Sequence, residues 1–154
     1  MLTQLDTFMA NMRGNNVGEM RFEGETVPPR SATEYFHQNC YVGASQPSPA
    51  DIQACLDVVG PERFMWGSDY PHEEGTYPFT LEALRQTMSG LDQKTAQQML
   101  AGTAAELYGF DLDKLRPLAD KVGPKVSEVA KPLTELPEGA NQALKRSHEM
   151  LVDA

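Results

Sequence analysis

The chain has few histidines and cysteines, no cluster of positive charge and no long apolar run. Its 154 residues carry a formal net charge of −9 and include only three histidines and two cysteines. Lysine and arginine do not cluster, which argues against a surface for a nucleic-acid backbone. No apolar run approaches the ~20 residues of a membrane span, and the first residues lack the pattern of a secretory signal. We therefore expect a cytoplasmic protein without nucleic-acid or membrane partners.

Motifs that identify common enzyme classes are also missing. The sequence has no GxGxxG, no phosphate-binding loop of the GxxxxGK[ST] type and no GxSxG. His72 and His148 each precede a glutamate, but the second histidine of a zinc-protease helix is absent. Cys40 and Cys55 do not form a CxxC pair, so we expect free, buried thiols in a reducing compartment.

The most informative positive signal is a short apolar run that ends at an acid. Phe64–Trp66 is large and apolar without alternation, which is typical of a parallel strand covered on both faces by helices. Asp69 follows at the expected carboxyl end of that strand. In α/β folds, ligands and catalytic residues collect at this end, so Asp69 is the first candidate site residue.

His72, Glu73 and Glu74 accompany Asp69 in the same predicted loop. A carboxylate at a strand end can ligate a metal or act as a base toward water that a cation has acidified. His72 can ligate, transfer a proton or orient a substrate. The alternative is structural: Asp69 caps the turn through its side-chain oxygens, and Glu73 and Glu74 are two solvated loop acids. The spacing alone leaves both interpretations open.

Local patterns predict alternating helices and strands. Ser48 and Pro49 form a typical helix start between two strand candidates, so a strand, helix, strand unit with parallel strands is expected. Four prolines between residues 111 and 137 favour an extended arm there. Strands are expected over residues 39–44 and 64–66, helices over about 2–12, 31–36, 49–59, 81–88, 92–109 and 139–151, and a long loop from Gly14 to Pro29.

The segment Met65-Trp66-Gly67-Ser68-Asp69-Tyr70-Pro71-His72, with Glu74-Gly75-Thr76, resembles the eighth strand and following loop of the metal-dependent amidohydrolase family that includes aminocarboxymuconate semialdehyde decarboxylase. Segments 31–42, 59–63 and 104–110 resemble the same family in the same order. The resemblance implies an α/β fold that corresponds to the C-terminal part of a (β/α)₈ TIM-type barrel, about strands seven and eight with their helices. Residues 1–110 would form this partial barrel, and residues 111–154 a C-terminal arm and helix.

The same resemblance implies a chemistry. Family enzymes use a divalent metal, often zinc, to hydrolyse or decarboxylate small organic substrates. Asp69 would then be a metal ligand and catalytic residue, and His72 would contact the substrate or support the site. The family's His-x-His pair has no counterpart, since His37, His72 and His148 are far apart in the sequence. Thr103 also replaces an expected asparagine at a helix start.

Two functional hypotheses follow. In the first, the chain contributes the strand-eight aspartate to a hydrolase or decarboxylase whose remaining ligands come from elsewhere, through a homo-oligomer or through association with a missing N-terminal part. In the second, the chain is a non-catalytic, truncated remnant that acts as an interaction or assembly module and holds no metal.

Overall fold

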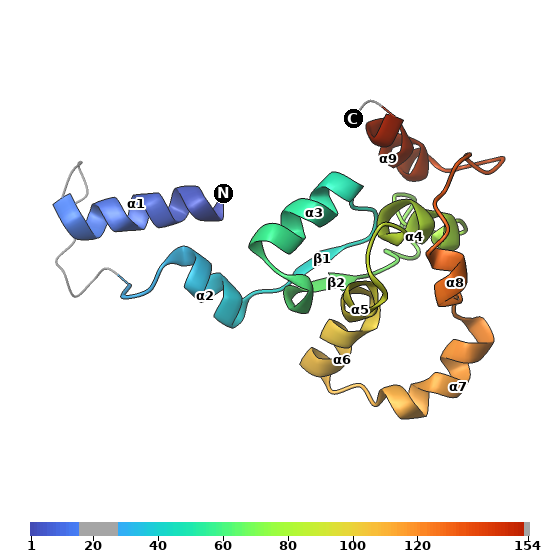
Figure 1. Cartoon of the computed structure of the whole chain (residues 1–154), viewed down its shortest axis with the longest axis horizontal. Helices are drawn as coiled ribbons and strands as arrows, with labels where there is room; N and C mark the ends of the chain where they lie inside the picture. The colour runs from blue at the N-terminus through green and yellow to red at the C-terminus, as the bar shows by residue number, and fades with distance from the viewer. Residues whose placement is uncertain (16–27, 153–154) are drawn as a thin grey trace. The chain divides into compact units, whose positions relative to one another are not determined.

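The computed structural model describes residues 1–15 and 28–152. Within these ranges the chain forms two compact units (Figure 1), unit 1 covering Met1–Tyr41 and unit 2 covering Val42–Ala154. Unit 1 contains helices α1 (Leu2–Asn15) and α2 (Ala32–Asn39). The predicted loop from Gly14 to Pro29 lies mostly outside the described residues.

Side-chain caps organise unit 1. The Ser31 hydroxyl accepts a hydrogen bond from the Glu34 amide, and the Glu34 carboxylate accepts one from the Ser31 amide. Helix α2 therefore begins as predicted and continues beyond the single expected turn. Asp6 of α1 accepts hydrogen bonds from the Thr33 amide (3.0 Å) and hydroxyl (2.5 Å). The predicted α1 helix is confirmed, but its apolar stripe is only partly covered, since Phe8 remains 53% exposed.

Unit 2 is built on a parallel pair of short strands. Strand β1 (Val42–Ala44) pairs with β2 (Phe64–Trp66), and helix α3 (Pro49–Val58) connects them. The Ser48 side chain caps α3, and Pro49 occupies its first turn, where a missing amide costs nothing. The predicted strand, helix, strand unit and its parallel pairing are therefore confirmed.

The sheet has one well-covered face. Phe64 is 2% exposed and packs in a core cluster with Ile52, Leu84 and Met88. Gly43 and Met65 lie on the opposite face, because successive side chains along a strand alternate between the two faces. This face is less covered, since Gly43 is exposed and Met65 is half-buried. The expectation that helices cover both faces is thus correct for one face only.

Helices α4 (Thr80–Met88), α5 (Gln93–Gln97), the π-helical turn η3 (Gln98–Gly102) and α6 (Thr103–Tyr108) follow β2. Asp92 caps α5 as predicted, accepting hydrogen bonds from the amides of Lys94 and Thr95. Thr103 is 1% exposed, and its hydroxyl donates to the Pro61 carbonyl oxygen (2.9 Å). The threonine at this helix start therefore ties α6 to the turn that precedes β2.

The extended arm predicted for residues 111–137 is wrong, because helices α7 (Leu112–Val122) and α8 (Val126–Val129) lie within it. Asp111 caps α7 by accepting from the Lys114 amide. The helical spacing of Leu112, Leu115 and Leu118 outweighs Pro117, although this proline lies in the middle of the helix and removes one backbone amide there.

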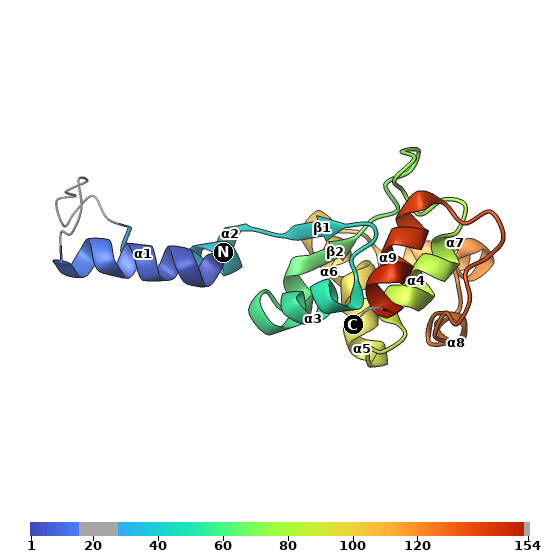
Figure 2. The ribbon, with the colours of Figure 1, turned by 90° about the horizontal axis from the view of Figure 1, so that it is seen from above.

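The last helix is confirmed as α9 (Gln142–Val152). It lies beside α4 (Figures 1 and 2), where Leu144 and Ala140 pack on Ala83 in a second core cluster. The described residues thus form a mixed helix and strand fold with one small parallel sheet. Within them, no helix combines the length and apolarity needed to cross a bilayer.

Both cysteines are free, as expected, but Cys40 is exposed and only Cys55 is partly buried. Cys40 caps the end of α2, where its backbone rather than its side chain is used. Burial raises the pKa of the Cys55 thiol.

Candidate metal site

The loop after β2 holds its shape through its own backbone. Asp69 adopts a left-handed conformation with φ of 57°, which aspartate tolerates better than most residues. The Asp69 carbonyl accepts from the His72 amide (2.9 Å), and the His72 carbonyl accepts from the Gly75 amide (3.0 Å). The Thr76 amide then donates to the Ser68 carbonyl (2.9 Å) and closes the loop. Asp69 and His72 are therefore turned toward the same side.

Gly75 is the point of closest approach in this loop. It is buried, and an added Cβ would lie 2.8 Å from the carbonyl oxygens of Ser68 and Asp69 and 3.0 Å from that of His72. All three neighbours are backbone atoms that cannot swing aside. Glycine is required here because the loop folds back onto itself.

Two side chains from distant segments hold the loop to the rest of unit 2. The Gly75 carbonyl accepts hydrogen bonds from the Asn141 amide group (2.9 Å) and, more loosely, from that of Gln46 (3.3 Å). Asn141 also accepts from the Leu144 amide (2.9 Å) and so caps the last helix. Thr76 is fully buried, and its hydroxyl lies 3.1 Å from that of Thr80.

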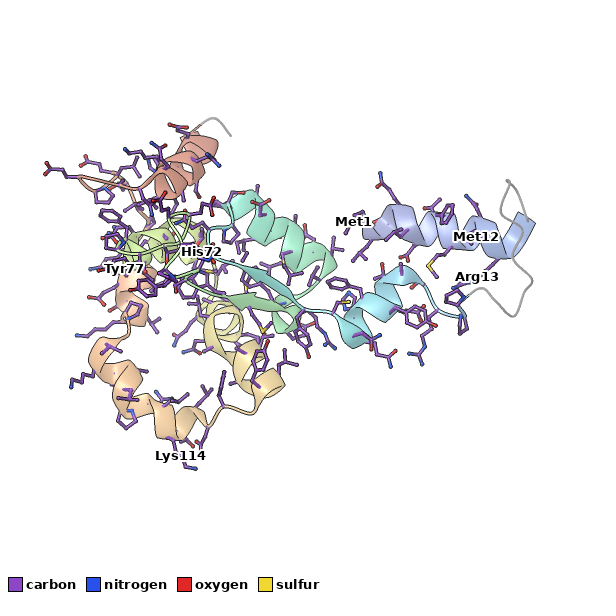
Figure 3. All side chains as sticks on the ribbon, turned by 180° about the vertical axis from the view of Figure 1, so that it is seen from behind. Met1, Met12, Arg13, His72, Tyr77 and Lys114 are labelled. Carbon is purple, nitrogen blue, oxygen red and sulfur yellow. The ribbon has the colours of Figure 1, made fainter. Side chains whose placement is uncertain are left out.

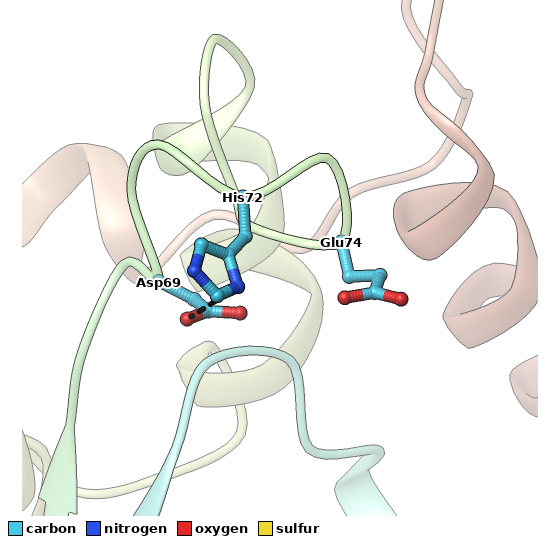
Figure 4. A group of neighbouring side chains, drawn as sticks. All are labelled: Asp69, His72 and Glu74. Carbon is cyan, nitrogen blue, oxygen red and sulfur yellow. Dashed lines mark ion pairs between the residues drawn. The ribbon is translucent and has the colours of Figure 1, made fainter.

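The loop brings three potential ligand side chains together (Figure 4). Ligand atoms of Asp69, His72 and Glu74 all lie within 4.8 Å of one another. The Asp69 Oδ1 and His72 Nδ1 atoms are 3.8 Å apart, and the two side chains are 44% and 68% exposed. Two carboxylates and an imidazole form an oxygen and nitrogen donor set that suits zinc and several other divalent cations. Three ligands leave coordination positions for further ligands or water.

Aromatic side chains flank this group. The rings of Tyr70 and Tyr77 pack edge to face with centroids 5.4 Å apart, and both are largely exposed. Figure 3 shows Tyr77 and His72 on this part of unit 2.

A hollow of about 600 Å³ opens beside Asp69 on the less covered face of the sheet. Gly43 and Met65 line its floor, and Tyr108 of α6 stands at its side. Tyr108 and the nearby Phe110 are 63% and 53% exposed. The carboxyl ends of both strands therefore face open space next to the candidate ligands.

Sequence reasoning predicted part of this arrangement. It singled out Asp69 and His72 and considered Glu73 and Glu74, of which Glu74 joins the group and Glu73 does not. Within the described part of the chain, the Asp69 carboxylate accepts no hydrogen bond, so backbone contacts rather than an aspartate cap close the turn. Gln46, Gly75 and Asn141 were missed, although an asparagine three residues before Leu144 is a typical helix cap.

Comparison with known proteins adds the family. A family model described as amidohydrolase matches residues 26–110, which is more than half of the chain. No curated protein and no solved structure matches the sequence at a significant level. The matched region contains both strands, α3 to α6 and the loop that carries Asp69, His72 and Glu74. The chain belongs to the amidohydrolase family.

Proposed function

We propose that the chain contributes Asp69 to a metal-dependent site that hydrolyses or decarboxylates small organic substrates. In this proposal β1 and β2 correspond to the seventh and eighth strands of a (β/α)₈ barrel, in the branch that includes aminocarboxymuconate semialdehyde decarboxylase. The observation that most directly supports this function is that Asp69, His72 and Glu74 lie close together after the carboxyl end of β2. Active sites of such barrels are formed by these loops.

Asp69, His72 and Glu74 are the residues that would hold a divalent cation, zinc being the commonest in the family. A bound cation would supply Lewis acidity to the reacting group. The Asp69 carboxylate has two oxygens, so one can ligate while the other accepts a proton. His72, 3.8 Å from Asp69, can orient the substrate or donate a hydrogen bond to that carboxylate.

The remaining ligands and pocket walls would come from outside residues 1–154, either from further copies of this chain or from an N-terminal part of the barrel. A two-stranded sheet leaves one unpaired edge on each strand, and such edges favour pairing with another chain. The hollow beside Asp69 lies on the less covered sheet face, where additional strands and their loops would complete a site.

A second function is supported by a different surface. Large apolar side chains are exposed over one continuous segment: Leu107, Tyr108, Phe110, Leu112, Leu115, Leu118, Val122 and Val126. Exposed apolar surface of this kind marks interaction sites. It favours a non-catalytic interaction or assembly module, in which the Asp69 group is a family feature without a metal.

Metal content decides between the two functions. We would measure bound metal in the purified chain by mass spectrometry and record its mass in solution in the same run. One ion per chain or per oligomer supports the metal site, whereas no retained metal together with a stable assembly supports the interaction module.

The matched variants are Asp69→Asn and Glu73→Gln. Asparagine tolerates the left-handed backbone of residue 69, so Asp69→Asn removes a charge without adding backbone strain. Glu73→Gln removes the same charge from the same loop but outside the ligand group. We expect Asp69→Asn to weaken zinc binding about tenfold or more and Glu73→Gln to leave it nearly unchanged. Equal losses in both variants would refute a specific role for Asp69.

A further inference from the structure

A second cavity in unit 2 lies away from the Asp69 loop, between the helical core and the α7–α8 segment. Its volume is about 530 Å³, inside the ~300–1,000 Å³ range of small-molecule sites. Trp66, Met88 and Leu100 form part of the wall on the core side, and Ala119 and Val126 part of the wall on the α7–α8 side. Two segments of the chain thus border one apolar space that is partly open to solvent.

The polar groups on this cavity's wall define what it can accept. The only polar side chains among its lining residues are Gln93, Gln97 and Asp120, and no cationic side chain lines it. The carboxamides can donate and accept hydrogen bonds. Asp120 disfavours an anion, because no positive charge on the wall would offset the repulsion. The lining therefore suits an uncharged molecule with a large apolar body and a hydrogen-bonding group.

Helix α7 leaves this space unfilled. None of its residues is buried, and Ala119 and Asp120 are its residues that line the cavity. The small residues Ala119 and Gly123 line the cavity, so α7 does not fill the space against the core. An apolar guest would gain dispersion contacts with the apolar part of this wall.

We propose that this cavity is a binding site for a neutral, apolar small molecule with an aromatic or alicyclic body. Its apolar part packs between Trp66 and α7, and its polar end meets Gln93 or Gln97. This site is independent of the proposed metal chemistry, since none of Asp69, His72 and Glu74 lines it.

The probe is N-phenyl-1-naphthylamine, a neutral apolar fluorophore that accepts excitation energy from tryptophan. Trp66 is the only tryptophan of the chain, so energy transfer reports on its surroundings alone. We expect saturable transfer with one probe per chain and about tenfold weaker binding of the anionic 1-anilinonaphthalene-8-sulfonate, which corresponds to about 1.4 kcal/mol. Unsaturable transfer, equal binding of the two probes, or one probe per two chains would overturn the proposal.

Trp66 also borders the hollow beside Asp69, so variants must locate the probe. Ala119→Phe adds an aromatic ring on the cavity side of α7, whereas Lys121→Phe adds the same ring to this exposed helix at a position that does not line the cavity. We expect about tenfold weaker probe binding in Ala119→Phe and less than a twofold change in Lys121→Phe.

Ala96→Leu tests the same space from the opposite wall if Ala119→Phe fails to fold. We expect it also to weaken probe binding while the circular dichroism spectrum is retained. Unchanged probe binding in a folded cavity-filling variant would refute the site.

Discussion

Replacing Gly75 by alanine tests whether the close approach of the loop backbone sets the geometry of the candidate site. The new Cβ would lie 2.8 Å from two carbonyl oxygens and 3.0 Å from a third. Since all three are backbone atoms, the loop must shift to relieve the contacts. Forcing an extra carbon into a well-packed position costs about 1–3 kcal/mol.

The matched control is Gly67→Ala, eight residues earlier at the end of β2. An added Cβ at Gly67 meets nothing within 4 Å. At such an open position, alanine stabilises the folded state by about 0.4–1 kcal/mol because it restricts the unfolded chain. The free energy of unfolding of the two variants should therefore differ by about 1.5–4 kcal/mol.

The assay is urea unfolding followed by the fluorescence of Trp66, combined with zinc titration of each folded variant. Gly75→Ala should lose both stability and zinc affinity, because the Gly75 carbonyl that anchors the loop to Asn141 moves with the backbone. Equal unfolding free energies for the two variants would show that this loop is not held as tightly as the three contacts imply.

Two further predictions concern other contacts. Thr103→Val keeps the side-chain shape but removes the hydroxyl that donates to the carbonyl oxygen of the partly buried Pro61. We therefore expect the unfolding free energy to fall by about 1–3 kcal/mol, measured against Thr134→Val at an exposed position. No loss would mean that another donor replaces the hydroxyl. In unit 1, hydrogen bonds from Thr33 lower the pKa of Asp6 below 3.8. The ionised Asp6 carboxylate therefore stabilises the α1–α2 contact fully at pH values above the ordinary carboxyl pKa. This stabilisation is lost as the pH falls through the lowered pKa of Asp6. The NMR chemical shift of the Thr33 amide should change with pH as Asp6 titrates, and this pH dependence should be absent in Asp6→Asn. A titration midpoint at or above 3.8 would contradict the lowered pKa of Asp6.

Local signals in the sequence predicted most helix starts. Helices begin close to the predicted positions at Ser31, Ser48 and Asp92, and each of these residues caps its helix, because a cap is a contact between residues two or three positions apart. The prediction for residues 111–137 is wrong because it depends on the prolines alone, whereas the leucine spacing of α7 favours a helix there. Single residues with opposite preferences compete, and their balance is hard to judge from sequence.

The sequence by itself determined the parallel pair of strands, the connecting helix and the position of Asp69 and His72 in the loop after β2, since all of these depend on short-range patterns. Only the tertiary structure decided that Glu74 rather than Glu73 joins them, because that choice depends on how the loop closes around Gly75. The same holds for Asn141, which meets Gly75 across 66 positions of the chain, and for the cavity between Trp66 and α7. Contacts between distant segments depend on how whole elements pack, and no local pattern encodes them.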